Sequence, residues 1–255
     1  MKNLLGNMLA RCHSSGSKTV MPDMRPDEPF YAVGDLHGST SLLIQLLGQI
    51  ADAGHLNDPV VFIGDYVDRG EDTAGTLAHL YALAMDPRRR TIFLKGNHEQ
   101  MLLDFLDAPE EVGDFWVRSG GKYSLASFGI DQWSEMKPRE FTPLRNELRT
   151  KIGDDIEQWL RDLPVSWQSG NIFLSHAGAD PSCSLDAQTN DRLLWGHGGA
   201  LPSARSDGIW TVQGHKIVQR PVIAEGQVFI DTGAYATHNL TAARFYPGGV
   251  SFLST

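Results

Sequence analysis

Short apolar runs and longer amphipathic stretches alternate over the first hundred residues of the chain. Mostly apolar runs that end at glycine or lysine predict buried strands at 30–33, 60–63 and 91–94. Between these runs, apolar residues recur every three or four positions, which predicts amphipathic helices at 39–53 and 73–85. Because strands that alternate with helices form βαβ units, the pattern predicts right-handed crossovers and a mainly parallel sheet.

The pattern changes after the third predicted strand. Helical periodicity dominates from about residue 100 to 165, for example at 152–163, so we expect a group of helices that departs from the sheet. Short apolar runs separated by glycine and proline return after Asn171 and predict a second group of strands. Residues 1–28 contain serine, glycine and proline without periodicity and are interpreted as a flexible leader. The remainder, 29–255, is expected to form a single domain.

The composition disfavours several classes of protein. The 255 residues carry a net charge of −9, whereas a non-specific nucleic-acid binder needs a basic surface. No apolar run approaches the roughly 18 residues of a membrane span. The apolar stretch at 4–10 is short and interrupted by Asn7, unlike a signal peptide. We therefore expect a cytoplasmic protein without a nucleic-acid or membrane partner, and no pattern indicates its oligomeric state.

Five polar clusters follow apolar runs, and each contains residues that bind metals or transfer protons. They are Gly34-Asp35-Leu36-His37-Gly38, Gly64-Asp65-Tyr66-Val67-Asp68-Arg69-Gly70, Gly96-Asn97-His98-Glu99, Ser175-His176-Ala177-Gly178 and Gly214-His215. An apolar run that stops at glycine and a polar cluster is typical of a buried strand that presents ligands at its end. Five such groups of Asp, His and Asn can build a two-metal centre, which indicates a metal-dependent hydrolase.

The residue types in these clusters suit a carboxylate-bridged pair of cations. Asp35 and His37 are separated by one residue, so in extended chain their side chains point the same way and one ion can bind both. Asp65 has two carboxylate oxygens and can bridge two cations, and the later clusters supply neutral ligands for the second ion: Asn97, His176 and His215. A mixed nitrogen and oxygen set without thiolate fits manganese, iron or zinc, and we expect two manganese ions.

Residues beside these ligands can complete a phosphate-cleaving site. Two cations about 3.5–4 Å apart can deprotonate a water between them and accept negative charge from a phosphoryl group. Arg69 is placed to bind phosphoryl oxygens with its forked guanidinium, together with Asn97. His98 is placed to protonate the leaving oxygen, and Asp68 can orient His98 and raise its pKa.

The order and spacing of the five clusters resemble the calcineurin-like metallophosphoesterase superfamily, whose consensus runs GDxHG, GDxxDRG, GNHE, HAG and GH. The second and third clusters are similar to its serine/threonine protein phosphatase branch. Segments at 100–104, 120–121 and 230–234 add similarity to the bacterial and phage-lambda-type phosphatases. The resemblance covers roughly Phe30 to Tyr246.

This resemblance implies an α/β fold of two packed mixed β-sheets flanked by helices in four αββα layers, with a dinuclear metal site at the strand ends and 29–255 as the catalytic domain. It also implies the division of ligands between the two ions. The first ion is held by Asp35, His37 and Asp65, and the second is held by Asp65, Asn97, His176 and His215.

Residues and resemblance together favour a serine/threonine phosphoprotein phosphatase that acts on a phosphorylated protein or peptide. A hydroxide that bridges the metals is expected to attack phosphorus in line, with no covalent phosphoenzyme. One segment departs from the bacterial pattern, which places a phosphate-binding arginine soon after a tryptophan. Here Gly196-His197-Gly198-Gly199 follows Trp195. Either His197 takes this role, or Arg192 or Arg205 reaches in, or the second clamp is missing.

Two alternatives remain open. Symmetrical diadenosine tetraphosphate hydrolases resemble this chain in the first cluster, but they more often carry GNHD and lack the second aspartate of GDxxDRG, whereas this chain has Glu99 and Asp68. A non-catalytic module that binds metal or a phosphopeptide is the alternative from another class. Such a module has no need of a proton donor such as His98.

Overall fold

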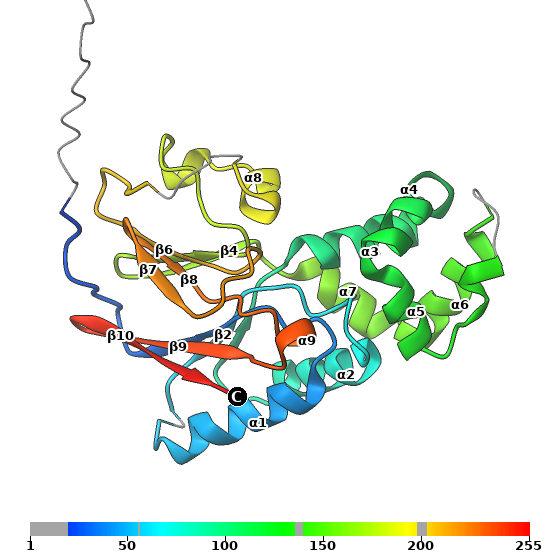
Figure 1. Cartoon of the computed structure of the whole chain (residues 1–255), viewed down its shortest axis with the longest axis horizontal. Helices are drawn as coiled ribbons and strands as arrows, with labels where there is room; N and C mark the ends of the chain where they lie inside the picture. Colours follow the sequence, from blue (N-terminus) through cyan, green and yellow to red (C-terminus); the bar gives the residue numbers. More distant parts are fainter. Residues whose placement is uncertain (1–19, 56, 136–139, 198–202) are drawn as a thin grey trace, which may run out of the picture.

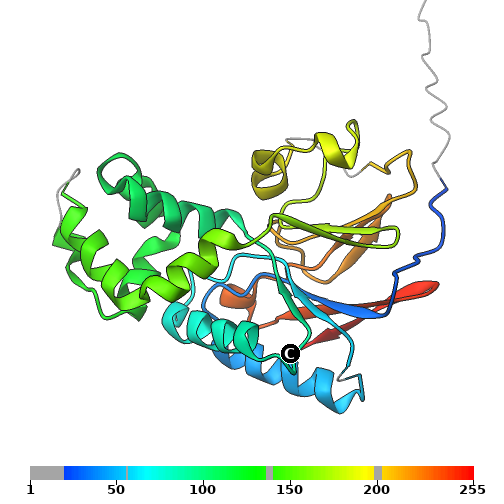
Figure 2. The same cartoon turned by 180° about the vertical axis from the view of Figure 1, so that it is seen from behind.

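Two five-stranded mixed β-sheets pack face to face in the computed structural model, which describes residues 20–55, 57–135, 140–197 and 203–255. Helices cover the outer faces of the sheets, and a further group of helices stands at one end of the sandwich (Figure 1). The view from behind shows the same arrangement (Figure 2). The predicted αββα architecture is confirmed.

The first sheet joins the three N-terminal strands to a hairpin from the C-terminus. Its strands are β1 (Phe30–Val33), β2 (Val60–Phe62), β3 (Thr91–Phe93), β9 (Thr241–Tyr246) and β10 (Gly249–Ser254). Their spatial order is β10-β9-β1-β2-β3, in which β1, β2 and β3 run parallel and the hairpin strands are antiparallel. The parallel part agrees with the predicted βαβ units, and the hairpin makes the sheet mixed.

The second sheet is built from the C-terminal half of the chain. Its strands are β4 (Ser166–Ser169), β5 (Ile172–Ser175), β6 (Trp210–Gln213), β7 (Val222–Ala224) and β8 (Gln227–Phe229). Their order is β4-β5-β6-β8-β7, with β5, β6 and β8 parallel and both edge strands antiparallel. The predicted second group of strands therefore begins slightly earlier than Asn171.

The helices form two sets: those that cover the outer faces of the sheets, and the helical group at one end of the sandwich. The covering helices are α1 (Thr40–Asp52) and α2 (Thr73–Met85) on the first sheet, α8 (Asn190–Trp195) on the second, and the short α9 (Ala234–Thr237). The helical group comprises α3 (Asn97–Asp107), α4 (Pro109–Trp116), a π-helical turn (Val117–Gly121), α5 (Lys122–Ser127), α6 (Thr142–Ile152) and α7 (Asp154–Asp162). Two short 3₁₀ turns lie at Gln132–Glu135 and Leu185–Ala187. None of the described helices is long and apolar enough to cross a bilayer.

Residue alternation along the central strands explains the layers. Phe30 and Ala32 of β1 pack between the two sheets, whereas Tyr31 and Val33 pack in the core beneath the helices. Successive side chains of a strand point to opposite faces, so a strand with four buried residues must be covered on both sides. The continuous apolar runs in the sequence therefore predict central strands.

The helical group occupies the predicted segment, although one boundary inside it was predicted wrongly. The periodic stretch at 152–163 contains the end of α6 and all of α7 rather than one helix. Gly153 separates them with φ of 82°, a left-handed conformation that glycine adopts without steric cost. Residues 39–53 and 73–85 form α1 and α2 within a residue or so of the predicted ends.

The described part of the predicted leader is held against the body of the protein. Met24 is buried in the core between the sheets, and the Arg25 N–H donates to Asn171 Oδ1 at 2.7 Å. Trp210 Nε1 donates to the Pro22 carbonyl at 2.9 Å. The predicted flexible segment of 1–28 is therefore too long, because residues 22–28 contact the body of the protein; residues 1–19 lie outside the described residues.

A close approach of two glycine turns holds the ends of β2 and β3 together. Gly64 has φ of 101°, and a Cβ there would lie 2.6 Å from the Gly96 Cα. We predict that Gly64→Ala lowers the free energy of unfolding by about 1–3 kcal/mol, because it introduces both backbone strain and a clash. Gly48→Ala in α1, where a Cβ meets nothing within 4 Å, should instead stabilise by about 0.5–1 kcal/mol. Urea unfolding compares them, and a Gly64→Ala variant as stable as the parent would contradict this constraint.

Candidate metal centre

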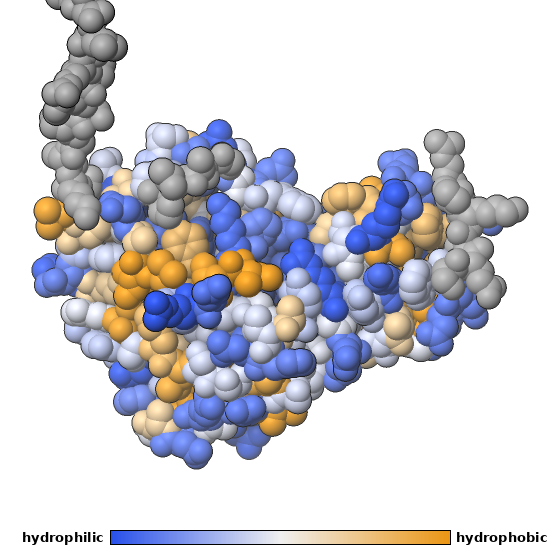
Figure 3. Space-filling model, viewed as in Figure 1, coloured by the Kyte–Doolittle hydropathy of each residue, from blue (hydrophilic) through white to orange (hydrophobic). Residues whose placement is uncertain are grey.

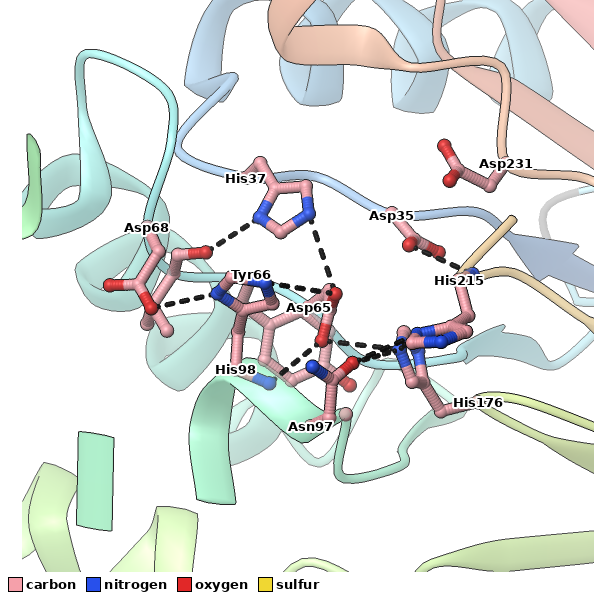
Figure 4. A network of polar contacts seen from close by, with 12 residues as sticks. Asp35, His37, Asp65, Tyr66, Asp68, Asn97, His98, His176, His215 and Asp231 are labelled. Atoms are coloured by element: carbon pink, nitrogen blue, oxygen red, sulfur yellow. Dashed lines mark hydrogen bonds and ion pairs between the residues drawn. The ribbon is translucent and has the colours of Figure 1, made fainter. Parts of the chain in front are cut away.

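The predicted ligand residues meet where parallel strands of both sheets end. Asp35 and His37 follow β1, Asp65 follows β2, and Asn97 begins α3 just beyond β3. From the second sheet come residues that follow β5 and β6, namely His176 and His215. Because the carboxyl ends of parallel strands lie at one edge of a sheet, six distant positions converge on one buried cluster (Figure 4).

Asp65 stands between two groups of nitrogen ligands. Its Oδ2 lies 3.4 Å from His37 Nε2, and its Oδ1 lies 3.3 Å from His176 Nε2. One group of side chains that could hold a metal ion contains His37, Asp65 and His98, and a second contains Asp65, His176 and His215. One carboxylate shared by two groups, with one oxygen toward each, is the geometry that a bridging ligand requires.

Asn97 completes the second group. Its Oδ1 lies 2.8 Å from His176 Nε2 and 3.0 Å from His215 Nδ1, so three ligand atoms converge on a space the size of one ion. The opposite ring nitrogen of His176 contacts the Ile63 carbonyl, which fixes the orientation of the ring. Such a backbone contact is typical of a metal-binding histidine.

Asp35 differs from the expectation drawn from the sequence. The extended geometry predicted for Asp35 and His37 is wrong, because His37 has φ of 43° and the chain turns there. Asp35 Oδ2 accepts the His215 N–H at 3.0 Å, while its buried Oδ1 has no hydrogen-bond partner in the described part of the chain. A buried carboxylate oxygen without a donor is costly, and a bound cation would remove that cost.

The pKa shifts of the buried carboxylates and imidazoles also fit a site for a divalent cation. Burial, reinforced by the nearby Asp231 carboxylate, raises the pKa of Asp35 well above its usual range. Burial opposes ionisation of His176 as well, but the carboxylates of Asp65 and Asp35 outweigh it and raise the pKa of His176 to about 10. Burial lowers the pKa of His37 to about 3, so its ring is neutral and available as a ligand. This donor set, rich in oxygen and imidazole, fits divalent cations.

Glu99 is the positioning residue that the sequence did not reveal beyond its place in a motif. Its carboxylate accepts four backbone N–H groups: Asp65 at 2.8 Å, Tyr66 at 2.7 Å, Val67 at 3.3 Å and Gly96 at 2.8 Å. It therefore joins the turn after β2 to the start of α3. A glutamate at the third position of a helix that follows a strand is the signal that could have indicated this role.

Asp68 and His98 form a buried pair beside Asp65. His98 Nδ1 lies 2.8 Å from Asp68 Oδ2, as the sequence predicted, and the pKa of His98 is raised because Asp65 and Asp68 together outweigh burial. His98 Nε2 is buried, has no hydrogen-bond partner among the described residues, and lies 4.0 Å from Asp65 Oδ2. The unpartnered nitrogen therefore faces the ligand cluster.

The helical group fixes Asp68 from the opposite side. Trp116 Nε1 donates to Asp68 Oδ2 at 3.0 Å, and Ser124 Oγ donates to Asp68 Oδ1 at 2.6 Å. Neither contact was predicted, because nothing in the local pattern of α4 or α5 indicates a partner some fifty residues earlier. The helical group is therefore part of the site and not only an appendage.

Arg69 lies at the edge of the cluster. Its guanidinium is stacked 5.6 Å from the centre of the Tyr235 ring, which also packs edge-on against His37 at 5.3 Å. No carboxylate in the described part of the chain lies within 4.0 Å of that guanidinium. Arg69 is therefore able to bind an anion, and Tyr235 was missed by the sequence reasoning.

The three candidates for a second phosphate clamp are not brought to the cluster. Arg205 is buried, pairs with Asp207 and donates to the carbonyls of Asp180 and Cys183. Arg192 pairs with Asp180. His197 is exposed, and no described polar contact joins it to the ligand residues. Both arginines therefore hold the segment around α8 together. Of the arginines considered for phosphate binding, Arg69 is the one that lies at the ligand cluster.

The fold and the buried cluster define a metal-binding hydrolase. The chain belongs to the calcineurin-like phosphoesterase family, whose model matches residues 28–220. This match confirms the family that the five motifs indicate.

Two relatives and one solved structure show how widely this framework is shared. The chain is 30% identical over 219 residues to serine/threonine-protein phosphatase 2 of Salmonella typhimurium (strain LT2), covering 83% of this chain and 90% of the relative. It is 40% identical over 260 residues to the symmetrical bis(5'-nucleosyl)-tetraphosphatase of Ralstonia nicotianae, with 85% and 89% covered. A cold-active protein tyrosine phosphatase shares the fold with a TM-score of 0.59 and 19% identity, covering 91% of this chain and 81% of that one.

We predict that Glu99→Gln weakens divalent metal binding by about 10–100-fold, because the amide cannot accept four backbone N–H groups and the turn that carries Asp65 loosens. The free energy of unfolding should fall by about 1–3 kcal/mol. Titration calorimetry with Mn²⁺ measures the affinity. Glu111→Gln, an exposed change on α4, is the matched control and should bind metal as the parent does. Equal affinities for both variants would show that Glu99 does not position the ligands.

We predict that Asp65→Asn loses more metal than any other single-ligand change, because it removes the one side chain shared by both groups. The measurement is metal stoichiometry by elemental analysis after loading with Mn²⁺, together with the rise in Tm that Mn²⁺ causes in the parent. His197→Asn is the control and should keep the parental stoichiometry. Two metals retained at parental affinity in Asp65→Asn would mean that the bridge is assigned wrongly.

Proposed function

We propose that the protein is a phosphomonoesterase that removes phosphate from phosphoserine or phosphothreonine in proteins. The observation that carries this proposal is the Asp68–His98 pair, with Nδ1 held by a buried carboxylate and Nε2 turned toward Asp65. This is the arrangement of a positioned proton donor. A serine or threonine alkoxide is a poor leaving group and needs such a donor.

The metal ligands are proposed to divide as the motifs imply. Asp35, His37 and Asp65 hold one divalent cation, and the other is held by Asp65, Asn97, His176 and His215. When bound, the cations lower the pKa of a coordinated water and polarise the phosphoryl oxygens. We propose manganese as the physiological metal, because the ligand set contains carboxylate, amide and imidazole without thiolate.

The remaining steps belong to side chains. Arg69 binds two phosphoryl oxygens through its planar guanidinium and stays over Tyr235 while it does so. Asn97, which is both a ligand and a neighbour of His98, orients the phosphoryl group. His98 Nε2 gives its proton to the leaving oxygen, and Asp68 holds the ring and stabilises its charged form. Water attacks directly, without a covalent phosphoenzyme.

A symmetrical dinucleoside tetraphosphate hydrolase is the second candidate, favoured by the 40% identity to the Ralstonia nicotianae enzyme. The two candidates differ in the leaving group, because a nucleotide phosphate departs with much less need of a proton than an alkoxide. A panel containing phosphoserine peptides, phosphotyrosine peptides, phosphodiesters and diadenosine tetraphosphate decides between them by kcat/KM. A clear preference for diadenosine tetraphosphate would overturn the phosphoprotein proposal.

A binding module without catalysis is disfavoured by the same site. Neither Asp68 nor the guanidinium of Arg69 belongs to the groups of side chains that could hold a metal ion. Burial of the Asp68 carboxylate costs stability unless both of its oxygens accept hydrogen bonds. Here His98, Trp116 and Ser124, which belong to three different helices, contact these two oxygens. A protein that only bound metal would have no use for this arrangement.

We predict that His98→Asn keeps both metals but loses about 10²–10⁴-fold in kcat on a phosphoserine peptide, the usual range for general acid catalysis. The loss on an aryl phosphate should be clearly smaller, because a nitrophenolate leaves without a proton. Asp68→Asn should show the same pattern more mildly. Steady-state kinetics on both substrates, with metal content measured in parallel, make the comparison.

The opposite results are equally informative. Equal losses on both substrates with metal intact would mean that His98 binds phosphate or orients the nucleophile. Loss of one metal in His98→Asn would make His98 a ligand, as its place in one of the metal-binding groups allows.

A further inference from the structure

A groove begins at Arg69 and runs away from the metal ligands. It has a volume of about 550 Å³, within the usual range of roughly 300–1,000 Å³ for ligand sites and much larger than one phosphate needs. Arg118, Lys122 and Tyr123 of the helical group line one side, and Tyr235 of α9 lines the other. On the face shown in Figure 3, side chains at the junction of sheets and helical group are mostly hydrophilic.

The wall of the groove is fixed to the catalytic centre by the backbone. The Arg69 N–H donates to the Gly120 carbonyl at 3.2 Å. Gly120 has φ of 128°, and a Cβ there would lie 2.8 Å from Arg69 Cγ, so only glycine allows the π-helical turn to approach so closely. The non-helical conformation of Gly120 marks a kink between α4 and α5 at the point where the chain meets Arg69. Arg118 lies within this turn and Lys122 directly follows it, so the backbone positions of both are fixed relative to Arg69.

The charge of the groove contrasts with that of the chain. Three of its lining residues are cationic and one, Glu71, is acidic, in a protein whose net charge is −9. Arg118 is partly compensated by its ion pair with Asp114. Lys122 is half-buried and its ammonium lies over two aromatic rings, 5.0 Å from Tyr123 and 5.9 Å from Trp133. Aromatic faces hold the ammonium in place while leaving it free to bind an anion.

We propose that this groove binds a second anionic group of the substrate, the carboxylate of an acidic residue close to the phosphoserine, and that Lys122 is the residue that determines this specificity. The inference rests on the proposed phosphoprotein function and deepens it. The groove is open, continuous with Arg69 and lined by an exposed tyrosine, which suits an extended peptide whose phosphoserine lies at Arg69. Lys122 then pairs with a carboxylate on a neighbouring residue.

The test uses two phosphoserine peptides that differ only in charge, with glutamates on both sides of the phosphoserine in one and glutamines in the other. The readout is the ratio of kcat/KM for the two peptides, measured with the metal-loaded full-length protein. We expect the parent to prefer the glutamate peptide by about three- to tenfold, and 0.5 M salt should reduce this preference. Lys122→Glu should abolish or reverse the ratio, whereas Lys122→Arg should retain it.

Lys151→Glu on α6 is the matched control, because it changes the net charge by the same amount at an exposed lysine outside the groove. It should leave the ratio of the parent unchanged. A parent without preference, or a Lys122→Glu variant with the parental ratio, would overturn the subsite. An equal change in Lys122→Glu and Lys151→Glu would also overturn it, because overall charge would then explain the preference.

Inhibition separates this proposal from the proposed function. Both peptides are also tested as competitive inhibitors of aryl phosphate hydrolysis, with the ratio of inhibition constants compared between the parent and Lys122→Glu. If neither phosphoserine peptide is hydrolysed, the phosphoprotein function fails. The inhibition constants still decide the subsite, because a Lys122-dependent preference supports it and equal constants refute it.

Discussion

The buried carboxylate of Glu99 is the interaction on which the rest of the site depends. Four backbone N–H groups from two separate turns converge on it, so the end of β2 and the start of α3 cannot move independently. Burial and the nearby Asp65 raise the pKa of Glu99 to about 7, and the backbone N–H groups of Gly96 and Tyr66 oppose this rise. The same turns carry the shared ligand Asp65, the amide of Asn97 and the imidazole of His98. One side chain therefore sets the relative positions of Asp65, Asn97 and His98.

The site stores unfavourable energy that the scaffold must offset. Seven non-glycine residues in the described part of the chain have positive φ, and five of them belong to the motif clusters: His37, Asp65, Asp68, Arg69 and His215. Each such residue costs on the order of 1–3 kcal/mol and persists only where surrounding contacts fix it. The buried carboxylates add to this cost. A bound cation would relieve the charge but not the strain, so the strain has to be balanced by the core between the sheets and by the helical group.

The sequence predicts the parts of the molecule that depend on local pattern. The helix at 73–85 was predicted with its observed ends from its apolar periodicity and from Pro87 beyond its end, and the structure adds that Asp72 caps its start. The convergence of the candidate ligands was predictable because each of them follows an apolar strand. The conformation at His37 was not, because its left-handed turn is imposed by contacts with the chain after β2. The hydrogen bonds from Trp116 and Ser124 to Asp68 could not be predicted either, since they join segments that only the tertiary fold brings together.

The sheets and the helical group contribute different parts of the site. The strand ends present most of the candidate metal ligands, in a chain similar to relatives named as a serine/threonine-protein phosphatase and as a bis(5'-nucleosyl)-tetraphosphatase. Beyond the first turn of α3, which carries Asn97 and His98, the helical group contributes none of the candidate ligands, yet it fixes Asp68 and supplies one wall of the groove at Arg69. Because the Arg69 N–H donates to the Gly120 carbonyl and two helical-group side chains bond Asp68, a change in these helices alters the groove and the Asp68–His98 pair together. Under the proposed function, substrate choice therefore depends on the helical group, whose residues Arg118, Lys122 and Tyr123 line the groove beside Arg69.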